Sequence, residues 1–455
     1  MPSRGHRAVT LLAYRAAGGV SGAPGTPQLP FFWRSTDASI ACTTNRVAVF
    51  ALYSKSSVRI GAPEQNLGGH DRDDDGHRNR HVFVIVLENE GFDTTFGPNS
   101  KAPFLSKTLT AQGVLLNQYF GTGHVSLDNY VAMISGQAAT PETRNGCQVY
   151  ADFVQTGTTP DGPAIGNGCV YPASVKTLAD QLTASGKTWR GYMEDMGNDP
   201  ARESATCGHP VLNAVDHTQA AEAIDQYASR HNPFVYFHSI VDSPDCQKNV
   251  VNLTALPADL ARRDRTPNLV FITPNLCNDG HDGPCKNGQP GGLVSGDAFL
   301  QKWIPLIEAS AAFQDGGLIV ITFDEGGLTV GPNPNGPGIV VSGQGLFCCN
   351  EQPGPNLGPF SQSTNIAPRV ALAFNSYGGD RTGTVLLANF LKPGTVSNIP
   401  FNHYSLLKTL EDFFDLDEHL GFAGAPGLQG FFGCTNSDVA VRDRDLFSRC
   451  DFDAR

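Results

Sequence analysis

The stretch His81-Val82-Phe83-Val84-Ile85-Val86-Leu87-Glu88-Asn89 decides the architecture that this sequence predicts. Its first residues are mostly β-branched or apolar, and the polar segment 71–80 and Gly91 bound them, which is typical of a strand buried on both faces. Such a strand is expected to run into a turn, whereas this one ends in a carboxylate and an amide. The later run 318–323 is equally apolar and leads directly into Asp324 and Glu325.

The carboxyl ends of these two strands are expected to lie at one edge of a sheet. In open α/β sheets that edge is where ligands bind. Carboxylate and amide oxygens are the ligands that hard or borderline divalent cations prefer. We therefore predict a divalent metal site formed by Glu88, Asn89, Asp324 and Glu325, with a donor set that suits Mg, Ca or Mn.

Helix and strand patterns alternate from about residue 80 to residue 415, which favours one large α/β domain over two or three small ones. We assign residues 81–420 to this domain. Residues 1–80 are expected to be a poorly structured leader or a start assigned too far upstream. Residues 421–455 are expected to form a Gly-rich tail that cysteines hold in place.

Charge and hydropathy disfavour two classes of partner. The chain has 32 Lys and Arg against 44 Asp and Glu, a net charge of −12, and an acidic field repels nucleic-acid backbones. No run of about 18 apolar residues is present, so the sequence predicts no transmembrane helix. Residues 1–41 contain arginines but lack the apolar core of a signal peptide.

The eleven cysteines are many for a cytosolic enzyme. Their spacing places them inside loops and not in CxxC metal pairs, as in Cys147/Cys169, Cys207/Cys246, Cys277/Cys285 and Cys434/Cys450. We interpret them as disulfides, and hence as a sign of a secreted or cell-envelope protein, with the connectivity left open. The alternative is a set of reduced, buried cysteines. Cys348 and Cys349 are adjacent and are not expected to bond each other.

A Gly-containing turn and a serine lie between a predicted strand, 114–120, and a predicted helix, 127–134. Ser126 therefore falls at a helix N-terminus, where the dipole favours an anion and eases deprotonation of the hydroxyl. A serine in this place is often only a structural N-cap. Here the neighbouring His124, and Asn129 one helical turn after Ser126, favour a role for Ser126 as a nucleophile whose alkoxide is also a metal ligand. The Asn129 amide would donate a hydrogen bond to a bound anion.

Three further histidines fall at positions that can converge on the same edge. His238 lies near the end of a predicted strand, 234–240, His281 lies in a Gly-rich loop, and His403 leads a predicted helix, 404–414. One of them could protonate a leaving oxygen. Asp282 is a second-rank candidate, because an aspartate beside Gly280 and Gly283 is also a common turn former.

Five segments in this order resemble the phosphoesterase family of bacterial acid phosphatases and phospholipases C: Val84–Asn89, Gly123–Tyr130, Asn278–Gly283, Ile321–Glu325 and Asn402–Leu407. The resemblance covers roughly residues 81–418 and is closest to the shorter secreted acid phosphatases, including those acting on phosphoinositides. It implies an alkaline-phosphatase-like fold, a three-layer α/β sandwich with a mostly parallel central sheet and helices on both faces.

The resemblance also implies roles for the candidate residues. Glu88, Asn89, Asp324 and Glu325 would hold the metal, with Zn and Fe added as candidates because they occur in related folds. Ser126 would be phosphorylated transiently, and Asn129, His281 and His403 would line the phosphate. Two positions depart from the family pattern: Val125, where relatives often carry Pro, and Gly326-Gly327, where they often carry another acid.

Three functions therefore compete. The first is an exported metal-dependent phosphatase that hydrolyses phosphate monoesters, including phosphoinositides, through phospho-Ser126. The second is a phospholipase C-type phosphodiesterase, which an open apolar rim formed by the loops 137–173 and 241–266 would favour. The third is a binding protein that keeps the fold without catalysis, which predicts that Ser126→Ala changes nothing.

Overall fold

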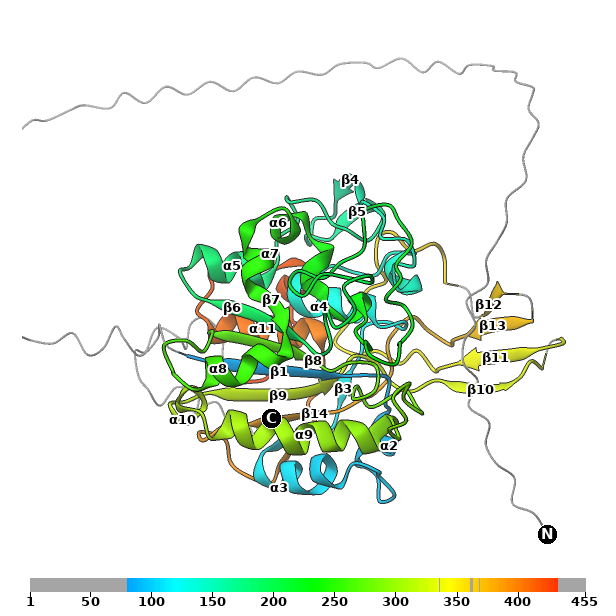
Figure 1. The fold of residues 1–455 in the computed structure, drawn as a ribbon. Helices are drawn as coiled ribbons and strands as arrows, with labels where there is room; N and C mark the ends of the chain where they lie inside the picture. The colour runs from blue at the N-terminus through cyan, green and yellow to red at the C-terminus, as the bar shows by residue number, and fades with distance from the viewer. Residues whose placement is uncertain (1–79, 335, 361–362, 368, 433–455) are drawn as a thin grey trace, which may run out of the picture. The chain divides into compact units, whose positions relative to one another are not determined.

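An eight-stranded sheet forms the centre of the protein, and both acidic strands belong to it (Figure 1). The computed structural model describes residues 80–334, 336–360, 363–367 and 369–432, all within a compact unit that starts at Asp71. The strands follow one another across the sheet in the order β15 (Thr395–Ser397), β2 (Val114–Leu116), β14 (Thr384–Leu387), β9 (Leu318–Phe323), β1 (Val82–Leu87), β8 (Leu269–Thr273), β6 (Trp189–Met193) and β7 (Val250–Asn252).

The predicted strand ends lie side by side. β1 pairs in parallel with β9, and Leu87 lies opposite Phe323. The residues that follow, Glu88 and Asp324, therefore leave the sheet next to each other at its carboxyl edge, as predicted. β14 alone is antiparallel to its sheet neighbours, so the sheet is mostly parallel.

Helices cover both faces of the sheet, which confirms the predicted three layers (Figure 1). Alternate side chains of β1 enter two separate apolar cores, one shared with α4, α5 and α11 and the other with η1, α8, α9 and α10. The helices are α2 (Phe92–Phe96), the π-helix η1 (Phe104–Leu109), α3 (Thr110–Gln112), α4 (Leu127–Ser135), α5 (Leu178–Ala184), α6 (His238–Val241), α7 (Pro244–Asn249), α8 (Leu256–Leu260), α9 (Gly292–Glu308), α10 (Ala311–Gln314) and α11 (His403–Phe413), with 3-10 turns η2 (Thr143–Asn145), η3 (Ser229–His231), η4 (Pro233–Tyr236), η5 (Leu253–Ala255) and η6 (Gly421–Gly424).

Smaller sheets flank the central one. A four-stranded sheet extends away from the central sheet (Figure 1), and two strand pairs lie elsewhere. The four strands are β10 (Thr329–Pro332), β11 (Ile339–Ser342), β13 (Val370–Ala373) and β12 (Ser363–Ala367), and the pairs are β3 (Tyr119–Phe120) with β16 (Phe401–Asn402) and β4 (Val154–Thr158) with β5 (Ala164–Asn167).

One predicted segment is wrong. The apolar run 234–240 is not a strand: it forms η4 and then α6, because Pro233 starts a helical turn and the aromatic side chains pack into the core. The Gly- and Pro-rich segment 353–398 contributes β12, β13, β14 and β15. The predicted helix 127–134 is present as α4, and Gly136, which follows it, adopts the left-handed conformation at φ 65°.

The structure pairs all eight of the cysteines that it describes. Cys147–Cys169, Cys207–Cys246 and Cys277–Cys285 are disulfides, which confirms the interpretation of these cysteines as disulfide-bonded and gives the connectivity that the sequence left open. The adjacent Cys348 and Cys349 are also bonded to each other, so the expectation that they would not bond was wrong; Cys349 adopts a left-handed conformation at φ 64°. Cys42, Cys434 and Cys450 lie outside the described residues, as do residues 1–79 and most of the predicted tail. Of the helices described, none is long and apolar enough to cross a membrane.

Glu411 in α11 gives the fold a pH dependence. Its buried carboxyl accepts a hydrogen bond from the Leu420 backbone N–H at 2.9 Å, and burial raises its pKa from 4.5 to about 8. Because the folded state keeps a proton that the unfolded chain releases, this contribution to stability is complete below pH 4.5 and is lost as the pH rises through about 8.

Glu411→Gln is therefore expected to flatten the fall in melting temperature from mildly acidic to mildly alkaline pH, measured by thermal denaturation. Glu418→Gln, a substitution of an exposed glutamate just beyond the same helix, serves as the matched control and should leave the slope unchanged. Equal slopes for the wild type and Glu411→Gln would contradict the assignment.

Candidate functional site

The site begins where β1 and β9 end. Glu88, Asp324 and Glu325 are each at most 2% exposed. The Asn89 backbone N–H donates to Asp324 Oδ1 at 2.9 Å, which joins the two strand ends. Asn89 adopts a left-handed conformation at φ 50°, a conformation that asparagine tolerates better than most residues. The structure thus brings the four predicted metal ligands to one edge.

Several oxygens at this edge are buried and lack a hydrogen-bond partner within the described part of the chain: Asn89 Oδ1, Asp324 Oδ2 and Asp279 Oδ2. Burial, followed by the charges of Glu88 and Glu325, raises the pKa of Asp324 well above its ordinary value. Unpaired oxygens beside clustered carboxylates are the surroundings that a divalent cation stabilises. Among the described residues, no group of three or more His, Cys, Asp or Glu side chains is arranged so that it could hold a metal ion. The predicted metal site therefore needs Asn89 and Ser126 as ligands as well.

Ser126 occupies a strained turn. Val125 has φ 88° and Ser126 has φ 50°, and positive φ is rare for a β-branched residue. The Ser126 hydroxyl does not cap α4 within the described residues; it donates to Glu88 Oε2 at 2.8 Å. This geometry favours the nucleophile over the structural N-cap, since strain of this kind concentrates at functional sites.

Two residues that sequence reasoning missed hold Glu88. Tyr130, one turn into α4, donates to Glu88 Oε1, and His231 Nε2 lies 3.2 Å from Glu88 Oε2. The two rings stack with centroids 5.4 Å apart. Burial lowers the pKa of His231. Nothing in the local sequence marks either residue, although Tyr130 falls on the same helical face as Ser126 four positions earlier.

His124 and Glu325 form a buried ion pair next to the turn that carries Ser126. His124 Nδ1 lies 2.5 Å from Glu325 Oε2, its Nε2 lies 3.1 Å from Asp380 Oδ2, and its ring stacks on Phe374. Burial alone would lower the pKa of His124, but Glu325 and Asp380 raise it to about 9. Glu325 also accepts from the Val125 backbone N–H at 2.9 Å, so it fixes the strained turn.

Asn129 is fully engaged in the turn that precedes Ser126. Its Oδ1 accepts from the backbone N–H groups of Thr122 and Gly123, and its Nδ2 donates to the Gly123 carbonyl at 3.0 Å and to Asp128 Oδ1 at 3.2 Å. The predicted role as an anion donor would require the amide to break these bonds. Its observed contacts shape the turn.

His403 is buried and uses both ring nitrogens. Its Nδ1 lies 2.9 Å from the Tyr119 hydroxyl, and its Nε2 lies 2.5 Å from the Asp324 carbonyl. Since a carbonyl only accepts, Nε2 carries the proton and Nδ1 accepts from the tyrosine. Burial lowers the pKa of His403 to about 4, so the ring is neutral around neutral pH and holds the backbone of Asp324.

The loop 278–283 places His281 at the mouth of the site. The ring is half exposed, and Asn89 Nδ2 donates to its Nδ1 at 3.2 Å. Asp282 is also half exposed and lies 3.6 Å from the same ring. Buried Asp279 accepts from the backbone of both His281 and Asp282, and its own backbone carbonyl accepts from the Glu88 N–H at 2.7 Å. Asp279 thus forms the turn, as anticipated, and also lies beside Glu88.

His238 is separate from this group. Its ring pairs with Asp242 at 2.8 Å and with Asp152 at 3.2 Å. Both partners lie on the rim loops, so the described contacts link His238 to the rim and to none of the other candidate residues. Segment 234–240 was predicted to be a strand that carries His238 toward the edge of the sheet, but it forms η4 and α6 instead.

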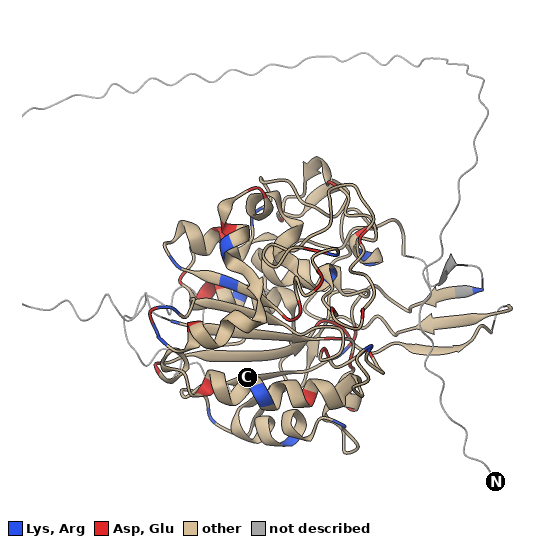
Figure 2. Cartoon of the chain, in the orientation of Figure 1, with Lys and Arg blue, Asp and Glu red and all other residues tan. Residues whose placement is uncertain are grey.

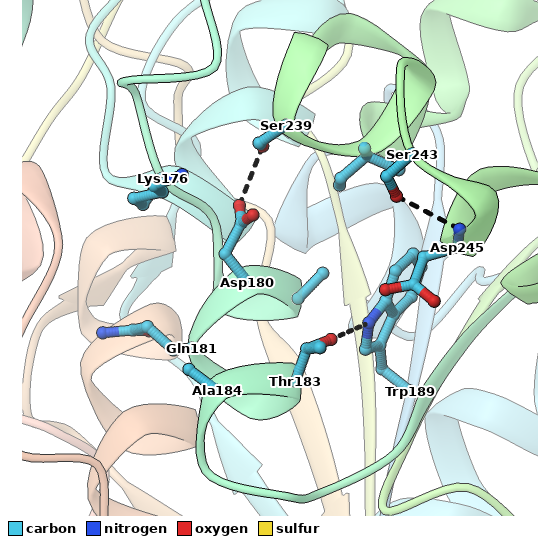
Figure 3. A pocket seen from close by; sticks show the side chains of 11 residues that line it. Lys176, Asp180, Gln181, Thr183, Ala184, Trp189, Ser239, Ser243 and Asp245 are labelled. Atoms are coloured by element: carbon cyan, nitrogen blue, oxygen red, sulfur yellow. Dashed lines mark hydrogen bonds between the residues drawn. The ribbon is translucent and has the colours of Figure 1, made fainter.

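A cavity of about 470 Å³ lies between α5 and α6 (Figure 3). Its polar side chains bond to one another: Ser239 donates to Asp180, and the Trp189 indole donates to Thr183. None of the candidate residues lines this cavity. A larger cleft of about 940 Å³ begins at Gly91 and Gly326, next to the site.

Comparison with known proteins shows which family the chain resembles. The phosphoesterase family model matches residues 98–417, a range that contains Ser126, Asp324 and Glu325. A phosphatidylinositol-3-phosphatase of Mycobacterium tuberculosis is 25% identical over 353 residues, which cover 78% of this chain and 83% of that protein.

Fungal acid phosphatases are similar over shorter stretches. The phosphate-repressible acid phosphatase of Penicillium chrysogenum is 28% identical over 55% of this chain, and the acid phosphatase of Aspergillus fumigatus is 25% identical over 54% of it. The aligned regions span only 48% and 44% of those two proteins. A Vibrio parahaemolyticus protein in the alkaline phosphatase superfamily superimposes with a TM-score of 0.43 at 11% identity, over 76% of this chain and 69% of that one.

Proposed function

The chain belongs to the phosphoesterase family, and we propose from this premise that it is an exported, metal-dependent acid phosphatase that hydrolyses phosphate monoesters through phospho-Ser126. The observation that carries the proposal is the hydrogen bond from Ser126 Oγ to Glu88 Oε2 at 2.8 Å in a strained turn. The names of the acid phosphatase and phosphoinositide phosphatase relatives support it.

In the proposed reaction Ser126 is the nucleophile and its Oγ attacks phosphorus. Glu88 accepts the hydroxyl proton, because the hydrogen bond already points that way. Tyr130 and His231 hold Glu88 in place, and Glu325 and His124 hold the turn. The dipole of α4 favours negative charge at Ser126.

The metal would be held by Glu88, Asn89, Ser126 and Asp324, with Glu325 contributing the carboxylate oxygen that faces away from His124. A bound divalent cation would offset the charge of the phosphate and lower the pKa of the serine hydroxyl. The buried unpartnered oxygens of Asn89 and Asp324 are the structural support for this assignment. The oxygen-rich donor set suits Mg, Ca or Mn.

His281 is assigned as the proton donor to the leaving oxygen. The doubly protonated ring is the form that can give up a proton without becoming an anion; it lies half exposed at the mouth of the site, and in the neutral ring Nδ1 accepts from the Asn89 amide. His403 is reassigned from catalysis to positioning, because both of its nitrogens are committed to Tyr119 and Asp324.

One observation favours a second candidate, a phosphoester carried on a lipid. Val149 and Val154 on the rim loop 137–173 are 45% and 66% exposed, and Val149 forms a bridge with exposed Val215. Exposed apolar side chains on this loop are the feature expected to favour a lipid substrate. A phospholipase C-type reaction would cleave the diester, whereas a phosphoinositide phosphatase would cleave a monoester of the same lipid.

Hydrolysis of p-nitrophenyl phosphate and of bis-p-nitrophenyl phosphate by the full chain, from acidic to alkaline pH, separates these functions. We expect turnover of the monoester with an acidic optimum, lost with a chelator and restored by a divalent cation. A preference for the diester would support the phospholipase C reaction. Turnover that is insensitive to a chelator would contradict the proposed dependence on a metal. If neither ester is hydrolysed, the result would support a binding protein that keeps the fold without catalysis.

A further inference from the structure

The 940 Å³ cleft beside the site offers a place for the alcohol portion of the substrate. It starts at residues directly after the strand-end acids, Gly91 after Asn89 and Glu90, and Gly326 and Gly327 after Glu325. A Cβ at Gly326 would come within 2.7 Å of Asp380 Cβ, and one at Gly327 within 3.1 Å of the Asn89 carbonyl. These two glycines, where relatives often carry an acid, leave little room for a side chain at the entrance to the cleft and add no carboxylate to those of Glu90, Asp93 and Asp380.

The far wall comes from the four-stranded sheet and the loops that follow it. Val340 and Ser342 of β11 and Thr329 of β10 line the cleft, and neither strand contains a charged residue (Figure 2). Phe374, whose ring stacks on His124, joins this wall to the catalytic edge. The cleft is therefore continuous with the site.

Neutral polar groups predominate among the cleft side chains that can bond a ligand. The amides of Gln118, Gln344 and Asn375 have no side-chain hydrogen-bond partner in the part of the chain that the structure describes. Gln344 and Asn375 are neighbours, since the Asn375 backbone N–H donates to the Gln344 carbonyl at 3.2 Å. An amide both donates and accepts, which matches an alcohol hydroxyl.

The charged groups of the cleft are already paired. Arg381 is the sole Lys, Arg or His among the described lining residues; it bonds Asp93 at 2.9 Å, and its Cζ lies over the Phe92 ring, 4.3 Å from the ring centroid. Asp380 is paired with His124. A second anionic group on the substrate would meet no spare cation, which disfavours a polyanionic leaving group.

From these walls we infer that the cleft selects phosphate monoesters of neutral polyhydroxylated alcohols, such as a cyclic polyol or a sugar, and that Gln344 and Asn375 read their hydroxyls. The inference rests on the proposed function and names its substrate class. Amides that bond a hydroxyl discriminate against an ester that lacks it, because their groups are then left without a partner. Phe92 and Phe374 supply the apolar faces on which a ring can pack.

The test compares kcat/KM for myo-inositol 1-phosphate and p-nitrophenyl phosphate in the wild type and in the double variant Gln344→Leu/Asn375→Leu. Both positions are exposed, so these substitutions are expected to leave the fold intact. We expect the ratio of the two kcat/KM values to shift by about tenfold against the inositol ester, mainly through KM, as two lost hydrogen bonds predict. Gln314→Leu, an exposed amide in α10 near the amino end of β9, should not shift the ratio.

An unchanged ratio in the double variant would overturn the inference while leaving the phosphatase proposal intact. If the wild type hydrolyses neither ester, the phosphatase proposal fails, and calorimetry then tests the cleft alone. In that case the wild type should bind myo-inositol 1-phosphate more tightly than inorganic phosphate, and the double variant should bind the two ligands equally tightly. Equal binding of both ligands to the wild type would overturn the inference.

Discussion

Ser126→Ala is expected to reduce kcat for phosphate monoesters by on the order of 10³-fold or more, because the covalent route is lost with the hydroxyl. The structure supports a large loss of kcat, since Ser126 Oγ donates the hydrogen bond to Glu88 at the end of β1. The loss is expected in kcat more than in KM, because Glu88, Asn89 and Asp324 remain to hold the metal and the substrate phosphate after the Ser126 oxygen is removed. Steady-state kinetics on p-nitrophenyl phosphate measure it.

Ser135→Ala is the matched control for this experiment. It makes the same substitution at the other end of α4, and it removes two buried hydrogen bonds, from Ser135 Oγ to the Val131 carbonyl and from the Gln137 backbone N–H to Ser135 Oγ. A small loss of stability with kcat retained is expected. Comparable kcat values for Ser126→Ala and the wild type would reject Ser126 as the nucleophile.

Asp324→Asn is expected to remove metal-dependent stabilisation and nearly all activity. The Asp324 carboxyl is buried beside Glu88 and Glu325, and its Oδ2 lacks a partner within the described residues. Its raised pKa means that its ionised form is unfavourable in the metal-free protein. Asparagine is a neutral isostere, so the metal-free variant should be at least as stable as the metal-free wild type.

Thermal denaturation with and without divalent cation, together with metal content by mass spectrometry, tests this independently of turnover. The wild type should gain stability with the cation, as ligand binding to the folded state requires, and Asp324→Asn should gain little. Asp264→Asn, at an exposed carboxylate paired with Arg262, should behave like the wild type. Equal metal content and equal stabilisation in Asp324→Asn would remove Asp324 from the ligand set.

The sequence predicts those parts of the fold in which a single physical effect, such as burial of an apolar strand, determines the local structure. β1 and β9 are continuous apolar runs, and burial on both faces leaves a strand as their simplest structure. Because both strands end in acids, their parallel pairing was enough to predict the clustering of Glu88 and Asp324. Ser126 could be recognised as a candidate site residue for a similar reason, because it is a polar residue between a Gly-containing turn and a helix.

The parts that sequence reasoning missed depend on distant packing. Tyr130 reaches Glu88 from 42 residues away, and His403 meets Tyr119 across 284 residues. β14 is four residues long and sits in a Gly- and Pro-rich segment, so its place in the central sheet is set by β9 and β2 and not by its own pattern. Contacts of this kind turned the predicted acid His403 into a positioning residue.

The most direct test of the account is to locate the phosphoryl group during turnover. The full chain, loaded with divalent cation, would be mixed with p-nitrophenyl phosphate, quenched rapidly in acid, digested and analysed by mass spectrometry. We predict one phosphoryl group on the peptide that contains Ser126, absent in a sample treated in the same way without substrate. A phosphoryl group on another residue, or none on Ser126 during confirmed turnover, would contradict the account.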